Sequence, residues 1–225
     1  MKISVYIGEG ALPFPLAAER VAKEDILVGG LSGCTHFIMP GGRDRPYDAA
    51  LRGTGCRLIR RFVENGGTYI GICAGGYFGA KRVAFDVGFP LEVSEERELA
   101  FFPGTAIGPA YGKGTFDYES QRGARAALLE LEIGSFYAYY NGGCAFEGDF
   151  SGVRILARYA DLPGKPPAIL ECPIGKGKAI LSGVHLETDP EALSANDPYL
   201  PEIVQRLRST NEERLRFWGS LTHLA

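Results

Sequence analysis

Residues that build metal sites and disulfide frameworks are few or poorly spaced in this sequence. It contains three histidines and five cysteines in 225 residues, and the cysteines are odd in number, widely spaced and without a CxxC pair. A disulfide framework needs paired cysteines, and a zinc site needs closely spaced ligands. We therefore expect no metal and no cofactor, and we expect reduced thiols, as in a cytoplasmic protein.

An excess of positive charge and a long hydrophobic segment are also missing. Lys and Arg number 24 against 27 Asp and Glu, for a net charge of −3. Binding to nucleic acid needs clustered positive charge, and a membrane span needs roughly 18 consecutive apolar residues. The apolar run at residues 3–7 is also too short for a signal peptide. The sequence therefore predicts neither nucleic acid nor membrane as a partner.

Glycine, by contrast, is abundant, at 31 residues. Many glycines stand in pairs beside apolar runs, which is typical of tight turns and of backbone segments that approach each other closely. The length suits one α/β domain, and neither a repeat nor a linker divides the chain. We therefore expect a single domain over residues 1–225.

Apolar periodicity predicts an alternation of strands and helices in the first half of the chain and mostly strands in the second. Such an order is typical of a parallel sheet covered on both faces. The expected strands are 3–7, 25–28, 36–39, 68–72, 126–131, 136–140, 153–159, 168–172 and 178–182. The expected helices are 15–22, 56–64, 75–84 and 201–218, with a hairpin turn at 175–177 and a surface excursion at 104–123.

Two glycine-rich segments resemble nucleotide-binding motifs only superficially. Gly8-Glu9-Gly10 follows the first strand, but Pro13 stands where a dinucleotide fingerprint needs its third glycine. Residues 108–115 are one residue too short for a phosphate-binding loop, and a glycine separates their Lys from their Thr. Neither segment predicts a nucleotide site.

The segment Gly71-Ile72-Cys73-Ala74-Gly75 predicts a nucleophile on a sharp turn between a strand and a helix. Such a turn needs small residues two positions before and after the nucleophile, and Gly71 and Gly75 supply them. The turn exposes the sulfur above the sheet at the positive end of a helix, which favours a thiolate. Cys73 is therefore the candidate nucleophile, and the other four cysteines are expected to be structural.

A thiol nucleophile needs a base, and the base needs a group that orients it. His185 follows an apolar strand, and Glu187 lies two residues further on, on the same side of an extended segment. His36 begins a strand and His223 lies near the end of the sequence, so neither has this context. We therefore predict His185 as base and Glu187 as its orienting carboxylate.

Acyl transfer also needs backbone N–H donors for an oxyanion. Ala74 follows the nucleophile, and Gly42 lies in a turn directly after the predicted strand 36–39. Their two amides are the expected oxyanion hole.

Three separated segments together resemble the class I glutamine amidotransferase fold. They are Met39-Pro40-Gly41-Gly42-Arg43-Asp44-Arg45-Pro46-Tyr47, Gly71-Ile72-Cys73-Ala74-Gly75-Gly76-Tyr77-Phe78 and His185-Leu186-Glu187. With Tyr140-Asn141-Gly142-Gly143, they resemble more closely the N-terminal amidotransferase-like domain of some eukaryotic biotin-protein ligases and its stand-alone bacterial relatives. The resemblance implies a flavodoxin-like three-layer α/β sandwich, with a mostly parallel central sheet, antiparallel additions in the C-terminal half, and a Cys-His-Glu triad.

The sequence also departs from that family. Glutamine-using members carry Gln where this chain has Tyr77, and they place Pro where it has Leu186. These departures argue against free glutamine as the substrate. The Gly-Arg-Gly-Arg signature of a biotin-ligase catalytic domain is absent, so we do not expect this chain to biotinylate proteins by itself.

Three functions are compatible with the sequence. The leading hypothesis is a cysteine-dependent hydrolase or amidotransferase-like enzyme that acts on a small amide or ester. The second is a non-catalytic ligand-binding or regulatory module, which Tyr77 suggests. The third is a deglycase- or chaperone-like thiol protein, in which an acidic residue near the first strand, here Glu9, would tune the thiol.

The remaining predictions concern the pocket and its partners. The expected substrate-binding residues are Arg43, Asp44, Tyr47, Tyr77 and Asn141. The expected partner is a small-molecule substrate or ligand, and a protein partner or a homodimer is a further option.

Overall fold

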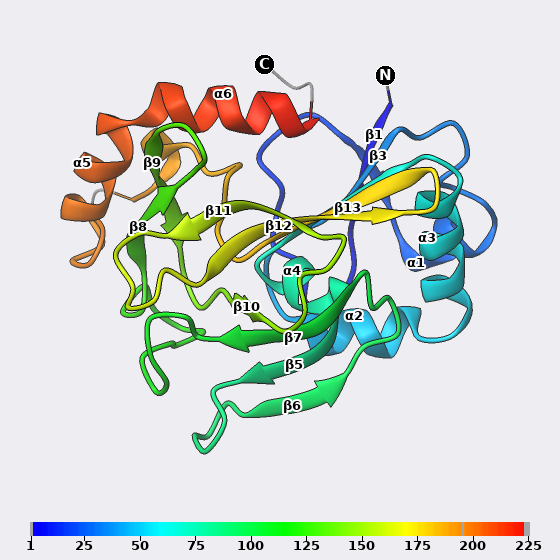
Figure 1. Ribbon diagram of the computed structural model, residues 1–225, viewed down its shortest axis with the longest axis horizontal. Helices are drawn as coiled ribbons and strands as arrows, with labels where there is room; N and C mark the ends of the chain where they lie inside the picture. Colours follow the sequence, from blue (N-terminus) through cyan, green and yellow to red (C-terminus); the bar gives the residue numbers. More distant parts are fainter. Residues whose placement is uncertain (1, 195, 223–225) are drawn as a thin grey trace.

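A nine-stranded sheet forms the centre of the computed structural model, which describes residues 2–194 and 196–222 (Figure 1). Its strands are β1 (Ile3–Tyr6), β2 (Glu19–Val21), β3 (His36–Met39), β4 (Thr68–Ile72), β8 (Arg125–Glu130), β9 (Ser135–Tyr140), β11 (Arg154–Tyr159), β12 (Pro167–Ile174) and β13 (Gly177–Ser182). They lie in the order β2-β1-β3-β4-β13-β12-β11-β8-β9. The first five are mutually parallel, and each of the last four is antiparallel to the strand before it in this order.

A second, four-stranded sheet lies apart from the first. It contains β5 (Ala80–Phe85), β6 (Val93–Glu96), β7 (Phe102–Gly108) and β10 (Ala145–Glu147), in the order β10-β7-β5-β6. The helices are α1 (Lys23–Leu27), α2 (Asp44–Leu51), α3 (Thr54–Glu64), α4 (Ala74–Gly79), α5 (Pro201–Ser209) and α6 (Asn211–Thr222), with a 3₁₀ turn η1 (Pro190–Ala192).

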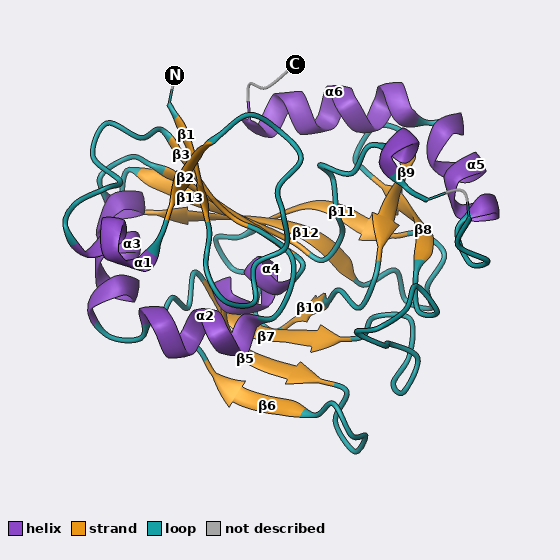
Figure 2. Cartoon of the chain, turned by 180° about the vertical axis from the view of Figure 1, so that it is seen from behind, coloured by secondary structure: helices purple, strands orange, loops and turns teal. Residues whose placement is uncertain are grey.

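The helices cover the main sheet on both faces (Figure 2). α1 to α4 and the second sheet lie on one face, and α6 crosses the other. Two large apolar clusters fill the spaces between these layers: Phe37, Tyr69 and Phe78 belong to one, and Ile70 and Trp218 to the other. The flavodoxin-like α/β sandwich expected from the sequence is therefore confirmed.

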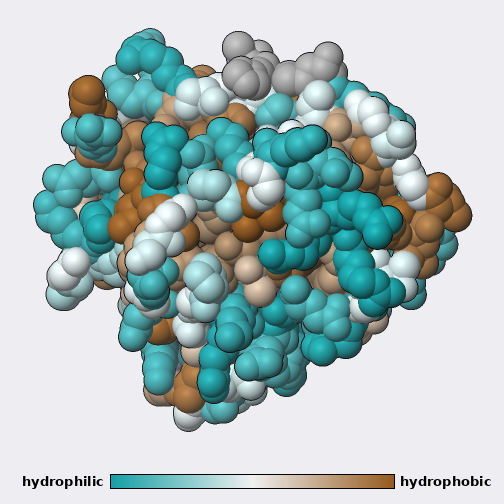
Figure 3. All heavy atoms as spheres, turned by 45° about the vertical axis from the view of Figure 1, so that its right-hand side comes forward, coloured by the Kyte–Doolittle hydropathy of each residue, from teal (hydrophilic) through white to brown (hydrophobic). Residues whose placement is uncertain are grey.

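The best-predicted elements are those whose sequence pattern is local. The run Thr68–Ile72 is buried throughout, as expected for an inner parallel strand. Helix α3 buries Cys56, Ile59 and Val63, which lie on one helical face. Gly175, at φ 58°, turns β12 into β13 as predicted. On the face that Figure 3 shows, hydrophilic residues cover most of the surface and hydrophobic residues form separate patches.

Two predictions near the N-terminus are wrong. Residues 15–22 were expected to be helical, but only Val21 is buried in Glu19–Val21, which pairs with β1 as an edge strand. Residues 25–28 were expected to be a strand, but the chain forms helix α1. Asp25 accepts a hydrogen bond from the Ala22 N–H at 2.8 Å, and this cap starts the helix.

The predicted helix 75–84 ends early. It stops at Gly79, and residues 80–85 continue as β5, in which Ala80, Val83 and Phe85 face the core. The predicted excursion 104–123 likewise begins as β7, which pairs with β5. The second sheet was missed because its strands are short and their pairing partners are distant in sequence.

The predicted C-terminal helix 201–218 is two helices. The hydroxyl of Thr210 accepts a hydrogen bond from the Tyr137 N–H at 2.8 Å, and the chain turns there between α5 and α6. A contact with β9 thus overrides the helical periodicity. None of the described helices is long and apolar enough to cross a membrane.

Candidate active site

Cys73 lies at a strained turn between β4 and α4. Its φ of 49° is in the left-handed region, which a residue with a side chain rarely adopts unless its surroundings enforce it. The Cys73 N–H donates to Ser182 O of β13 at 2.8 Å, which ties the turn to the neighbouring strand. The side chain is 6% exposed. This is the strand-turn-helix geometry of a nucleophile elbow.

The glycines around Cys73 are required by close backbone approach. A Cβ at Gly75 would lie 2.1 Å from Met39 O at the end of β3, and a Cβ at Gly71 would lie 2.2 Å from Gly75 O. Real Cβ atoms do not approach backbone oxygens this closely. The turn can therefore form only with glycine at both positions.

His185 follows β13 and lies against β9. Its N–H donates to Tyr139 O at 2.8 Å, and its Nδ1 pairs with Glu187 Oε1 at 2.8 Å. Both side chains are 8% exposed. Burial by itself lowers the pKa of His185, but the Glu187 carboxylate and Cys73 outweigh it and raise that pKa to about 10.

Cys73, His185 and Glu187 line one cavity of about 590 Å³. The Cys73 thiol donates to Asn141 O at 3.7 Å, and Cys73 is one of the groups that raise the pKa of His185. The structure therefore brings the sulfur and the imidazole together from distant parts of the chain. Glu9 is exposed and is not among the residues that line this cavity.

The predicted oxyanion residues Gly42 and Ala74 line the same cavity. Neither backbone N–H donates to an acceptor within residues 2–194 and 196–222. The Gly75 N–H donates to Pro40 O at 3.2 Å, which joins the elbow to the loop before Gly42. A Cβ at Gly41 would lie 2.4 Å from His185 Cε1, so this loop also packs against the imidazole.

Tyr47 does not line the cavity, contrary to prediction. It is fully buried, and its hydroxyl donates to Gly41 O at 2.9 Å and lies 3.2 Å from Pro40 O. Its aromatic body packs edge-on against Phe78. Tyr47 therefore holds the glycine loop from behind, through its hydroxyl contacts with the Gly41 and Pro40 carbonyls.

Tyr77, Arg43 and Asn141 do line the cavity. Burial raises the pKa of Tyr77 well above its ordinary value, and its hydroxyl donates to Gly142 O at 3.0 Å. The Arg43 guanidinium lies 4.4 Å from the centre of the Tyr118 ring. Asn141 Nδ2 donates to Gln121 Oε1 at 3.1 Å, whereas Asn141 Oδ1 is buried and has no hydrogen-bond partner in the described part of the chain.

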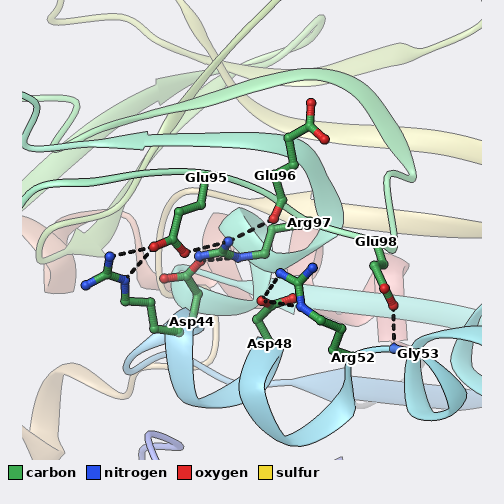
Figure 4. Close-up of polar contacts among 9 residues, drawn as sticks. Asp44, Asp48, Arg52, Gly53, Glu95, Glu96, Arg97 and Glu98 are labelled. Atoms are coloured by element: carbon green, nitrogen blue, oxygen red, sulfur yellow. Dashed lines mark hydrogen bonds and ion pairs between the residues drawn. The ribbon is translucent and has the colours of Figure 1, made fainter.

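Asp44 also lines the cavity, but an arginine already pairs with it (Figure 4). Arg97 Nε donates to Asp44 Oδ2 at 2.9 Å, and Arg97 Nη1 lies 3.0 Å from Glu95 Oε2. The Arg97 side chain is fully buried. Burial raises the pKa of Asp44, and Arg97 opposes that rise. Since Asp44 begins α2, this cluster attaches the second sheet to the helix that follows the glycine loop.

Sequence reasoning missed two further groups near the site. Tyr118 and Gln121 belong to the stretch expected to be a surface excursion, and they form part of the cavity wall. Arg214 of α6 is buried, and its guanidinium donates to Leu186 O between His185 and Glu187. No motif marks these residues, because only long-range folding places them here.

The other reactive residues lie outside this arrangement. His36 is at the opposite end of β3 from the glycine loop, and its Nδ1 lies 3.0 Å from Thr35 Oγ1. His223 lies outside the described residues. All five cysteines are free. Within the described residues, no group of three or more His, Cys, Asp or Glu side chains could hold a metal ion.

Fold and elbow together define a class I glutamine amidotransferase-like protein. A solved structure titled as a glutamine amidotransferase superposes with a TM-score of 0.55 at 26% identity, over 84% of this chain and 87% of that one. Residues 26–224 match the family described as "Biotin-protein ligase, N terminal". The chain therefore belongs to the biotin-protein ligase N-terminal domain family.

Two relatives illustrate how this domain occurs. An uncharacterized protein of Chlamydia muridarum is 40% identical over 198 residues, which cover 85% of this chain and 76% of the relative. A biotin–protein ligase of Schizosaccharomyces pombe is 34% identical over 92% of this chain but only 36% of its own length. This chain thus spans about a third of that ligase.

Proposed function

We propose that this protein is a cysteine-dependent hydrolase or amidotransferase-like enzyme acting on a small amide or ester. One observation carries the proposal: Cys73, on its strained turn, lines the same cavity as the hydrogen-bonded His185–Glu187 pair. In this reading Cys73 is the nucleophile, His185 the base and acid, and Glu187 the group that orients His185. The Gly42 and Ala74 amides would stabilise the oxyanion.

The reaction has two balanced steps. The Cys73 sulfur adds to the substrate carbonyl while His185 carries the thiol proton. His185 then protonates the departing amine or alcohol, which leaves a thioester on Cys73. In the second step His185 takes a proton from water, the hydroxide displaces the sulfur, and the proton returns to the thiol.

The cavity suits a small substrate, because a volume of about 590 Å³ lies within the range of small-molecule sites. The Tyr77 ring forms part of the cavity wall where the family resemblance leads us to expect Gln, so we propose a substrate other than glutamine.

The wider setting is also a proposal. We propose that residues 1–225 act as one domain and that the protein works in the cytoplasm, where its five thiols stay reduced. A protein partner or a homodimer stays a prediction.

Competition between cysteines tests the nucleophile directly. Cys34 is partly exposed and Cys73 is buried, so accessibility alone predicts that a mild electrophile labels Cys34 first. We expect mass spectrometry to find Cys73 labelled first, and Cys34→Ser to leave that rate unchanged. A panel of small amides and esters should then be hydrolysed by the wild type and not by Cys73→Ala.

Two outcomes would contradict this function. Labelling that follows exposure, with Cys34 first, would show that Cys73 is an ordinary buried thiol. Ligand binding that survives in Cys73→Ala, with no turnover in the wild type, would favour the non-catalytic binding module instead.

A further inference from the structure

The placement of Glu187 is not explained by its own side-chain contacts. Glu187 Oε1 pairs with His185 Nδ1, but Oε2 is buried and has no hydrogen-bond partner in residues 2–194 and 196–222. A carboxylate held by one contact can rotate away from that contact. Something else must therefore fix the backbone that presents Glu187 to His185.

The buried side chain of Arg214 reaches that backbone. Arg214 lies in the first half of α6, is 3% exposed, and donates from Nη1 to Leu186 O, the carbonyl between the two residues of the pair. Its Nε and Nη2 donate to Asn211 Oδ1 at 3.0 and 2.7 Å. The guanidinium plane is therefore fixed at one end by α6 and at the other by Leu186.

The start of α6 is itself tied to the strand that holds His185. Thr210 Oγ1 accepts the Tyr137 N–H of β9 at 2.8 Å, and Tyr139 O of the same strand accepts the His185 N–H at 2.8 Å. Strand β9 thus holds both His185 and the residue that precedes α6. Leu186, unlike a proline, does not restrict its own φ, so the hydrogen bond from Arg214 to its carbonyl helps to restrain this peptide.

We propose that Arg214 is a positioning residue that holds the His185-Leu186-Glu187 segment so that Glu187 stays hydrogen-bonded to His185. Asp189 and Glu187 are the carboxylates that attract its guanidinium. Arg214 does not itself line the cavity, and its hydrogen bond reaches the His185–Glu187 pair through the Leu186 carbonyl between them. Its importance for catalysis rests on the proposed function, but its effect on His185 does not.

Histidine NMR in the full chain tests this role without a substrate. His185 is faced by Glu187 from its own segment, by Cys73 from the elbow and by Tyr139 from β9. If Arg214→Met lets Glu187 move away from His185, the carboxylate no longer offsets the effect of burial, and the pKa of His185 falls. We expect its titration midpoint to fall by about one to three pH units. In Arg214→Lys, which keeps the charge and one donor, the His185 midpoint should fall less.

Arg216→Met is the matched control. Arg216 lies on the same helix, its side chain is 73% exposed, and it pairs with Glu212 at 3.5 Å. This variant should titrate like the wild type. If Arg214→Met does not fold, Asn211→Ala loosens the guanidinium without removing it, and a smaller fall in the same direction is expected.

The outcomes separate the two proposals. A folded Arg214→Met or Asn211→Ala protein with the wild-type His185 midpoint would overturn the positioning role, whatever the activity. A fall in the midpoint with no turnover in the wild type would support the positioning role and contradict the hydrolase. If both proposals hold, Arg214→Met should lower kcat more than it changes KM.

Discussion

Arg97 and Arg214 are both buried, yet they support different segments of the candidate site in different ways. Arg97 pairs with the carboxylates of Asp44 and Glu95 and holds the start of α2, next to the glycine loop. Arg214 donates to a carbonyl and to the Asn211 amide oxygen instead. Burial lowers the pKa of Arg214, and more distant carboxylates only partly oppose this.

We therefore expect the two arginines to matter for different properties, Arg97 for stability and Arg214 for the state of His185. Removing Arg97 leaves Asp44 as an unpaired carboxylate in a mostly buried place, so the main loss should be stability. Removing Arg214 leaves a carbonyl without its donor and a carboxylate less well placed, so the main change should appear at His185. The predictions below test whether the two sides of the site divide in this way.

The largest effect is expected at Glu187, on the Arg214 side. Glu187→Gln keeps the shape of the side chain but removes the carboxylate that orients His185 and favours its protonated form. We expect kcat to fall about 10⁴-fold, as for the equivalent change in other triads. Thermal stability at neutral pH should fall as well, because the Glu187 carboxylate stabilises the protonated form of His185 in the folded state. Glu191→Gln, an exposed carboxylate paired with Arg208, is the control and should retain full activity.

Arg97→Met should give the largest loss of stability. Breaking a buried ion pair by removing one partner costs about 3–5 kcal/mol. Urea unfolding measures this loss, and adding Asp44→Asn should recover part of it, because the unpaired carboxylate is then gone. Arg45→Met removes an exposed partner of Glu95 and should stay within about 0.5 kcal/mol of the wild type. Equal stability of the Arg97 and Arg45 variants would contradict the comparison.

Gly41→Ala tests the contact at which the two sides meet. The new Cβ would lie 2.4 Å from His185 Cε1, and the ring cannot move freely because Glu187 holds it. Overpacking of this kind costs about 1–3 kcal/mol, and if this cost falls on the transition state, kcat drops roughly 5- to 160-fold. Unchanged kcat, with normal labelling of Cys73, would mean that the glycine loop and His185 act independently.

The last perturbation is pH. The folded-state pKa of His185, about 10, lies above its ordinary value of 6.5, so protonated His185 stabilises the fold. That contribution is complete below the unfolded pKa and is lost as the pH rises through about 10. The stability difference between wild type and His185→Gln should shrink by up to about 1.4 kcal/mol per pH unit across this window. Repeating the titration with Cys73→Ser removes the part due to Cys73, and a difference constant in pH would contradict the raised pKa.

Much of the fold was predictable from patterns within a few residues. The buried run of β4, the helical face of α3 and the glycines around Cys73 all depend on local sterics and periodicity. Where local and distant forces disagreed, the prediction was wrong: residues 80–85 became β5 because β7 pairs with them, and a helix ended at Thr210 because its hydroxyl accepts the Tyr137 N–H of β9.

The site divides in the same manner. The sequence predicted the types of the site residues and the turns that carry them. It did not predict which polar side chains would be paired with other residues of the protein. Tyr47 turned out to hold the glycine loop, and Asp44 turned out to pair with Arg97. Neither partner could be read from the sequence, because each contact joins segments that meet only after the sheets have formed.

The sequence alone determined that Cys73 sits on a glycine-flanked turn and that His185 and Glu187 lie on one side of an extended segment, because both facts depend on neighbouring residues. Tertiary structure alone decided that these segments share a cavity. β4 and β13 are adjacent parallel strands, so their C-terminal ends emerge at the same edge of the sheet. Strand order is set by packing over the whole core, which no short stretch of sequence encodes.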